Sequence, residues 1–211
     1  MDMIDRHVFL DFHIDTNLIN SKSDIRGMNL LEQWNEREVI YIAMSEVAQK
    51  EAVGRGGGTR AEKAYTYAAT ETLANTPNEV KKLKQVAEIL FPQGIKSPSE
   101  RNDVEIVFNA HKYEAILITN DGDSKRQPKG ILGNAQKLRQ IGIEVLRVYE
   151  AIELIKRKIL QRDQTAREIA LATREPLPDW VGKDLNILED TLKLPVNETS
   201  QSENFLQMEV G

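Results

Sequence analysis

Three acidic residues, Asp15, Glu46 and Asp121, each stand within two residues of the end of a segment with the pattern of a β-strand. A fourth, Asp103, lies near the start of a helical pattern, on the same stripe as the apolar residues that follow it. Parallel strands present their carboxyl ends at one edge of a sheet. We therefore expect the fold to gather these four carboxylates near one edge.

Carboxylates gathered in a partly buried site repel one another unless their pKa values rise or a cation joins them. No Lys or Arg directly flanks Asp15, Glu46 or Asp121 in the sequence. Mg²⁺ and Mn²⁺ prefer carboxylate oxygens and water, and such ions clamp phosphate oxygens and activate water. The residue types therefore indicate metal-dependent hydrolysis of phosphodiester bonds. The absence of Cys from all 211 residues excludes thiolate zinc sites, iron–sulfur clusters, disulfides and cysteine nucleophiles.

The elements that must position these acids alternate along the chain. Apolar runs predict strands at residues 8–14, 39–44, 115–119 and 143–148. Apolar residues at helical spacing predict a crossover helix between the first two strands and further helices after the later ones. This alternation indicates an α/β sandwich around a central, mainly parallel sheet.

The chain divides into a domain at residues 1–161 and an appendage at 162–211. Within the domain, residues from about 52 to 100 read as a helical insertion. Three pairs in it have the form of a capping box that opens a helix, namely Thr59 with Glu62, Thr76 with Glu79 and Ser97 with Glu100. The appendage carries a Pro-rich break and a polar, unpatterned stretch, so we expect it to be partly helical and then loosely ordered.

The charge balance bears on the partners of the protein. Lys and Arg number 28 and Asp and Glu number 33, a net charge of −5, so binding of nucleic acid would need locally placed cations. Candidates follow the last acids or flank a glycine run, and they are Lys125, Arg126, Lys129, Arg55 and Arg60. No run reaches 18 apolar residues and the first residues lack a signal-peptide pattern, so we expect a cytoplasmic protein with no membrane partner.

Four segments together resemble the signature of PIN-domain ribonucleases, a family that includes the VapC-type toxins of bacterial toxin–antitoxin pairs. They occur in the family's order, each in its expected structural setting, at residues 14–19, 45–47, 102–110 and 116–123. The resemblance spans about residues 7–160 and implies a PIN-like three-layer sandwich. The stretch at 52–99 is longer than in the most compact toxins, and the tail has no counterpart.

The resemblance implies an endoribonuclease that depends on Mg²⁺ or Mn²⁺ and leaves a 5′-phosphate and a 3′-hydroxyl. On the family pattern the metal-binding acids are Asp15, Glu46, Asp103 and Asp121, with Asp123 as an auxiliary acid.

Two polar residues also match the family pattern. Asn17 and Thr119 stand at the positions that orient water or the scissile phosphate. Family members commonly form homodimers, and toxins of this type are blocked by an antitoxin that reaches into the acidic cleft. The resemblance therefore implies an RNA substrate, a homodimer and, for a toxin, an antitoxin partner.

Some of these residues have rivals or simpler explanations. Asp11 shares the strand face of Asp15, and Glu51 competes with Glu46 as a ligand. Asp123 belongs to an ordinary turn sequence, and turn chemistry alone explains an acid there. The three histidines show no paired metal spacing, so none is assigned a catalytic role.

Two other functions compete with a ribonuclease. In a phosphatase of the haloacid-dehalogenase type, Asp15 would be the nucleophile, but that chemistry requires a second Asp at the position of Asn17. The other is a PIN-like module that binds RNA or a protein without cutting, and an intact acidic quartet argues against it.

Overall fold

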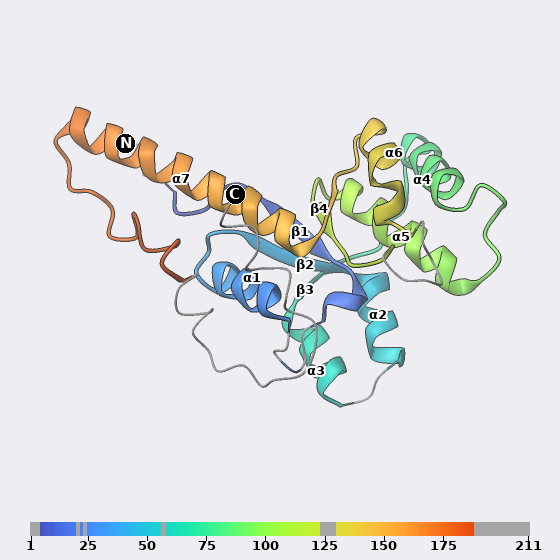
Figure 1. Ribbon diagram of the computed structural model, residues 1–211. Coiled ribbons are helices and arrows are strands. Elements are labelled where there is room, and N and C mark those ends of the chain that lie inside the picture. Colours follow the sequence, from blue (N-terminus) through green and yellow to red (C-terminus); the bar gives the residue numbers. More distant parts are fainter. Residues whose placement is uncertain (1–4, 20–21, 23–24, 56–57, 123–129, 188–211) are drawn as a thin grey trace, which may run out of the picture.

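A five-stranded parallel sheet lies at the centre of the computed structural model (Figure 1). The structure describes residues 5–19, 22, 25–55, 58–122 and 130–187. The strands are β1 (Asp11–Ile14), β2 (Tyr41–Ser45), β3 (Ala68–Thr70), β4 (Ile116–Ile118) and β5 (Val145–Leu146). They lie in the order β3-β2-β1-β4-β5, and each neighbouring pair is parallel. The predicted α/β fold with a mainly parallel sheet is confirmed.

Helices cover both faces of this sheet, so the fold is a three-layer sandwich (Figure 1). On one face α1 packs against α7, and on the other α4 packs against α5 and α6, while α2 contacts both α3 and α5. The α-helices are α1 (Arg26–Glu36), α2 (Glu46–Arg55), α3 (Thr59–Thr66), α4 (Pro77–Leu90), α5 (Pro98–Lys112), α6 (Ala135–Gln140) and α7 (Val148–Thr173). Two single 3-10 turns complete the elements, η1 (Thr16–Leu18) and η2 (Leu132–Asn134).

The register of the central strands sets the level at which each one ends. Ile14 on β1 lies opposite Ile118 on β4, and Asp15 N–H donates to the Ile118 carbonyl at 3.0 Å. Phe12 and Ile14 on β1 and Leu117 and Ile118 on β4 are fully buried. The residues that follow β1 and β4 therefore start side by side at the carboxyl edge of the sheet.

The segment predicted as a helical insertion contains α3, α4 and one element that the sequence patterns did not predict. That element is β3, whose Ala68 lies opposite Ala43 of β2. The capping boxes predicted at Thr76 and Ser97 are confirmed. The box predicted at Thr59 is wrong, because Gly58, with a φ of 76°, is the N-cap and Thr59 is the first helical residue.

Helix α7 runs unbroken through residue 161, where the sequence suggested that the domain ends, and continues to Thr173. Helix α1 approaches the first turn of α7 closely, since a Cβ on Gly27 of α1 would lie 2.4 Å from Val148 Cγ1 of α7. The chain beyond α7 returns to the core, where Ile187 is 4% exposed and packs in the main hydrophobic cluster.

A buried set of charges joins this returning segment to α7 and to the start of the described chain. Arg162 Nη2 lies 2.7 Å from Asp163 Oδ1 and 3.0 Å from Asp184 Oδ2. Arg6 also pairs with Asp184, whose side chain is completely buried. The two Arg and two Asp side chains balance in charge, which is how ionised groups remain stable away from water.

Two tryptophans pack around the same set of charges. The Trp34 indole N–H of α1 donates to the Asp184 carbonyl at 2.9 Å, and the Arg162 guanidinium lies 4.3 Å from the centre of the Trp180 ring. The segment after α7 is therefore fixed to α1 by polar contacts as well as by apolar packing.

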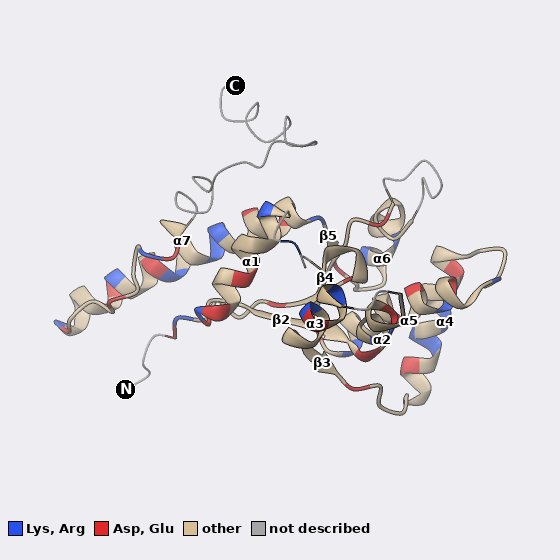
Figure 2. Ribbon diagram, turned by 90° about the horizontal axis from the view of Figure 1, so that it is seen from below, with Lys and Arg blue, Asp and Glu red and all other residues tan. Residues whose placement is uncertain are grey.

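The surface carries mixed charge. Figure 2 shows acidic and basic residues interspersed along α4 and α7. Among the described helices, none combines the length and the apolar character needed to cross a bilayer.

A histidine side chain is buried on the central strand β1. His13 on β1 is 3% exposed, its ring centre lies 6.0 Å from that of Tyr113, and its Nδ1 has no hydrogen-bond partner among the described residues. Burial lowers the pKa of His13 to about 4 because the protonated ring would lose its hydration.

The buried His13 should make the protein acid-sensitive. The unfolded chain takes up a proton near pH 6.5 and the folded chain only near pH 4, so stability is present above pH 6.5 and is lost as the pH falls toward 4. At pH 4 this effect lowers the free energy of unfolding by about 3 kcal/mol. Urea unfolding between pH 7 and 4 should show a shallower decline for His13→Phe than for His7→Phe, a control outside the core. An equal decline in both variants would contradict this account.

Removing one partner from the buried charges should destabilise the fold. Asp184→Ala leaves the guanidinium groups of Arg162 and Arg6 without their shared carboxylate, and breaking a buried pair in this way costs about 3–5 kcal/mol. Denaturant unfolding measures this loss. Glu153→Ala, which removes an exposed carboxylate paired with Lys156 on α7, should leave stability nearly unchanged. Equal effects of the two substitutions would show that the buried set is not required.

Candidate active site

Asp15 is the centre of the candidate site. It directly follows β1, caps η1, and is 5% exposed. Its Oδ1 accepts from the Thr16 N–H at 2.6 Å and from the Thr16 hydroxyl at 3.2 Å. Its Oδ2 accepts from the Thr119 hydroxyl and from the Asn17 amide, both at 2.7 Å. Both oxygens of this buried carboxylate are therefore satisfied, and its orientation is fixed.

Thr119 ties the end of β1 to the end of β4. Its fully buried hydroxyl donates to Asp15 and accepts from the Asp121 N–H at 2.9 Å and from the Asn17 amide at 3.1 Å. Asn17 closes the ring, because its Oδ1 accepts from the Asn120 N–H at 3.1 Å. The structure thus brings together four predicted site residues, Asp15, Asn17, Thr119 and Asp121.

Asp121 is half-buried, and the chain returns close to it. Asp121 Oδ2 accepts from the Ile131 N–H at 2.8 Å. A Cβ on Gly130 would lie 2.6 Å from that same oxygen, so only glycine fits this close approach. Sequence reasoning missed Gly130, since no local pattern signals a contact between residues this far apart in the chain.

The electrostatics of Asp15 reflect this setting. Burial is the main cause that raises the pKa of Asp15, and the charge of Asp121 raises it further. Hydrogen bonds from Thr119 and Thr16 oppose this rise by favouring the ionised form. Two carboxylates close enough to interact, one of them buried, form a site in which an added cation would be stabilised.

Glu46 has different partners. It is the first residue of α2, its side chain is 34% exposed, and it forms an ion pair with Lys50 one helical turn later. It also accepts from the Thr72 N–H at 3.1 Å. The Lys50 contact, followed by the Thr72 bonds, lowers the pKa of Glu46 to about 2. The spacing of four residues was the sequence signal for this pair, although no cation is adjacent to Glu46 in the sequence.

The remaining predicted residues belong to other elements or lie outside the described part of the chain. Asp103 is half-buried in the second turn of α5, on the helix whose residues Ile106, Val107 and Ala110 are buried as predicted. Asp11 begins β1 at the opposite edge of the sheet from Asp15, so it is not a rival ligand. The predicted residues that lie outside the described residues are Asp123, Lys125, Arg126 and Lys129.

The two predicted cations beside the glycine run lie on different helices. Arg55 is the last residue of α2, and its side chain lies outside the described part of the structure. Arg60 on α3 is half-buried, and its Nη2 donates to the Thr16 carbonyl at 2.6 Å. Arg60 therefore contacts the turn that follows Asp15.

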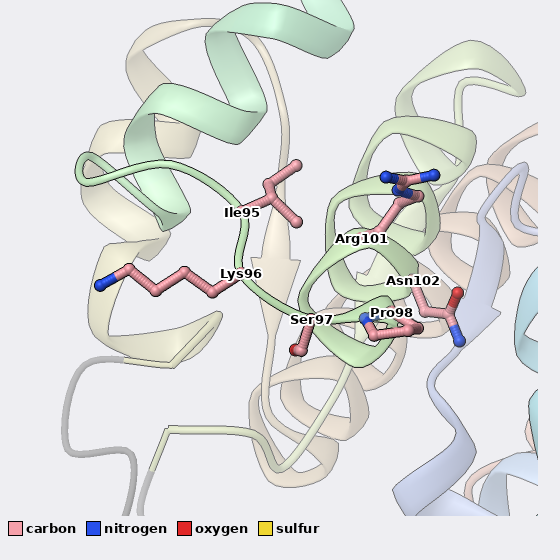
Figure 3. A pocket seen from close by; sticks show the side chains of 6 residues that line it. All are labelled: Ile95, Lys96, Ser97, Pro98, Arg101 and Asn102. Atoms are coloured by element: carbon pink, nitrogen blue, oxygen red, sulfur yellow. The ribbon is translucent and has the colours of Figure 1, made fainter.

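A pocket of about 270 Å³ lies at the start of α5 (Figure 3). Its lining residues are Ile95, Lys96, Ser97, Pro98, Arg101 and Asn102. Figure 3 shows the Lys96 and Arg101 side chains pointing away from one another, so the two cations do not converge on one ligand. The pocket is therefore not assigned as a phosphate site.

Comparison with known proteins gives similarity of structure only. No protein-family model and no curated protein matches the sequence. One similar solved structure is VapBC2 from Rickettsia felis bound to a DNA fragment from its promoter, with 18% identity and a TM-score of 0.43 over 65% of this chain and 98% of that one. Another is VapBC-1 from nontypeable Haemophilus influenzae, with 17% identity and a TM-score of 0.43 over 66% and 99%. Similarity at this level carries no argument about activity.

The carboxylates around Asp15 decide whether a divalent ion fits the site. Within the described residues, no three His, Asp or Glu side chains lie close enough together to hold a metal. Mg²⁺, however, is usually held by one or two carboxylates together with waters and substrate phosphates. Asp15 and Asp121 supply two interacting carboxylates, and an ion bound at Asp15 would replace one of the hydrogen bonds to its oxygens. These residues fit Mg²⁺ or Mn²⁺.

If Asp15 and Asp121 hold a divalent ion, Mn²⁺ should stabilise the folded chain. Binding at a hundred times the dissociation constant contributes about 2.7 kcal/mol, which raises the Tm of a chain of this size by roughly 5–10 °C. The effect should vanish in Asp15→Asn and persist in Asp11→Asn. Differential scanning fluorimetry with Mn²⁺ and with chelator measures it.

The pH dependence of this effect has a defined sign. Protonation of Asp15 removes a ligand, and its raised pKa means that protonation begins above the range of an exposed aspartate. The Mn²⁺ shift should therefore be full at neutral pH and fade on acidification earlier than for an exposed carboxylate site. A shift that is retained in Asp15→Asn, or that grows on acidification, would contradict the assignment.

Proposed function

We propose that this chain is an endoribonuclease that depends on Mg²⁺ or Mn²⁺ and hydrolyses RNA phosphodiester bonds. The observation that carries the proposal is the closed set of hydrogen bonds among Asp15, Asn17, Thr119 and Asp121 at the carboxyl ends of β1 and β4. These are residues for which the resemblance to PIN domains implied a role.

The proposed roles follow from the contacts. Asp15 and Asp121 would hold the ion, which would lower the pKa of a bound water and stabilise charge on the phosphate. Thr119 and Asn17 position the Asp15 carboxylate, and Asn17 is exposed, so its side chain faces the side from which a substrate arrives.

Asp103 and Glu46 complete the proposed quartet. Glu46 would have to exchange Lys50 for the ion, and an exposed pair one helical turn apart is weak enough for that exchange. Asp103 stands on α5, which contacts α2, the helix that begins with Glu46. Asp123, as the auxiliary acid, and the cations Lys125, Arg126 and Lys129 remain part of the proposal from their place in the sequence after Asp121.

The residue two positions after Asp15 argues against a phosphatase in which Asp15 is the nucleophile. That chemistry requires a second Asp at this position, whereas the chain has Asn17, whose amide donates to Asp15 Oδ2 at 2.7 Å. In a nuclease the attacking group is water, so no nucleophilic carboxylate is needed.

The toxin role is a further part of the proposal and rests on the sequence resemblance. It includes an antitoxin partner and a homodimer. Co-purification with the product of an adjacent small gene would support the toxin role, and arrest of growth on expression without that product would distinguish a toxin from a standalone RNA-processing enzyme.

Cleavage of RNA tests the proposal directly. Purified protein should cut single-stranded or structured RNA with Mn²⁺ and not with chelator. Asp15→Asn and Asp121→Asn should each lower the rate by about 100-fold or more, as loss of a main electrostatic group does. Asp11→Asn, at the other edge of the sheet, is the matched control.

Three outcomes would overturn parts of the proposal. Cutting that survives both substitutions would mean that the acids are misassigned or that a contaminant acts. Release of phosphate from a small phosphomonoester without RNA cleavage would favour the phosphatase. Binding of RNA without cutting under all metal conditions would favour the non-catalytic module.

A further inference from the structure

We propose that Arg60 is a positioning residue of the active site, which holds from α3 the turn that carries Asp15 and Asn17. Its Nη2 donates to the Thr16 carbonyl at 2.6 Å. Thr16 stands between the two site residues, and its own N–H donates to Asp15 Oδ1. The role in catalysis rests on the proposed function, whereas the role in holding the turn does not.

The Thr16 carbonyl has a clear need for such a donor. It belongs to η1, a single 3-10 turn, and its backbone partner is the Ile19 N–H at the long distance of 3.4 Å. A carbonyl oxygen has two lone pairs, so the Thr16 carbonyl can accept a second hydrogen bond beside this long one. A hydrogen bond from a charged guanidinium is also stronger than one between neutral groups.

The helix that carries Arg60 is itself held at its other end. Glu32 of α1 accepts from Lys63 at 2.9 Å and from the Tyr67 hydroxyl. Gln49 of α2 donates to the Ala64 carbonyl at 3.0 Å and to the Tyr67 carbonyl at 3.4 Å. Ala64 is fully buried beneath these contacts.

These contacts make α3 a fixed support for the guanidinium. Figure 1 shows α3 beside α1, below the sheet, in the segment that the sequence indicated as an insertion. Glu32 of α1 and Gln49 of α2 anchor the far end of α3. Arg60, in the first turn of α3, reaches η1. The insertion is therefore part of the structure that orients Asp15.

The sequence suggested a different role for Arg60, contact with the RNA backbone. The structure favours positioning because the residue is half-buried and its Nε is buried, without a hydrogen-bond partner among the described residues. A guanidinium whose Nη2 already donates to the Thr16 carbonyl has fewer donors left for a phosphate.

Hydrogen exchange at the turn is the first test. In the full chain without metal or RNA, Arg60→Ala should speed exchange of the Thr16 and Leu18 amide protons, which bond to Asp15, by about tenfold. Arg60→Lys should restore part of the protection, because it keeps the charge but not the geometry. Glu32→Gln, which loosens the anchor of α3, should change the same protons in the same direction.

Arg139→Ala is the matched control. It removes from α6 an exposed guanidinium whose Nη2 lies 2.7 Å from Glu144 Oε1. It should leave hydrogen exchange at the turn after Asp15 unchanged. Circular dichroism verifies folding, and Arg60→Lys keeps the test available if Arg60→Ala does not fold.

Metal affinity and kinetics provide the second test. Mn²⁺ affinity measured by calorimetry without RNA should fall about tenfold in Arg60→Ala, the size typical for loss of a group that orients a ligand. The kcat for RNA cleavage should fall while KM stays near the wild-type value.

Two results separate the possible failures. Unchanged exchange at Thr16 and unchanged Mn²⁺ affinity, with weaker RNA binding and a salt dependence reduced by about one ion, would overturn positioning in favour of phosphate contact. Wild-type protein that neither binds Mn²⁺ nor cuts RNA would overturn the proposed function. Faster exchange at Thr16 in Arg60→Ala would still support the positioning role in that case.

Discussion

The hydrogen bond from Thr119 to Asp15 is the contact on which the rest of the site depends. It joins residues 104 positions apart in the chain, and it exists because β1 and β4 are neighbours that end at the same level. A carboxylate buried to this degree is costly unless donors surround it. Thr16, Asn17 and Thr119 supply those donors. The register of β1 and β4 is therefore also what places the Thr119 donor at the Asp15 carboxylate.

The acids predicted to act together have opposite electrostatic settings. Burial raises the pKa of Asp15, whereas Lys50 and Thr72 lower that of Glu46. A proton or a metal ion added to the site therefore relieves a cost at Asp15, while Glu46 gains only if it leaves Lys50. On the function proposed above, Asp15 with Asp121 beside it would bind a cation first, and Glu46 would join by exchanging Lys50 for it.

Local pattern predicted the strands that carry the site: apolar residues recur at period two through β1, whereas β2 and β4 lie in short apolar runs, and polar residues follow all three. It did not predict β3, since Ala68–Thr70 has no apolar alternation and forms through its pairing with β2. The proximity of Gly130 to Asp121 and the burial of Asp184 depend on contacts distant in sequence, which no local pattern encodes. Asp15, Glu46 and Asp121 were visible because each follows a strand, whereas the residues that support them were not.

Helix α1 connects these supports. Its Glu32 anchors α3, which holds the turn after Asp15 through Arg60, and its Trp34 bonds to Asp184 in the segment after α7. Glu32 and Trp34 are two residues apart, so they leave different sides of one helix toward two segments that the sequence presented as an insertion and an appendage. A single rigid helix thus holds both additions against the sheet. The orientation of Asp15 is therefore set by residues from the insertion as well as by the strands.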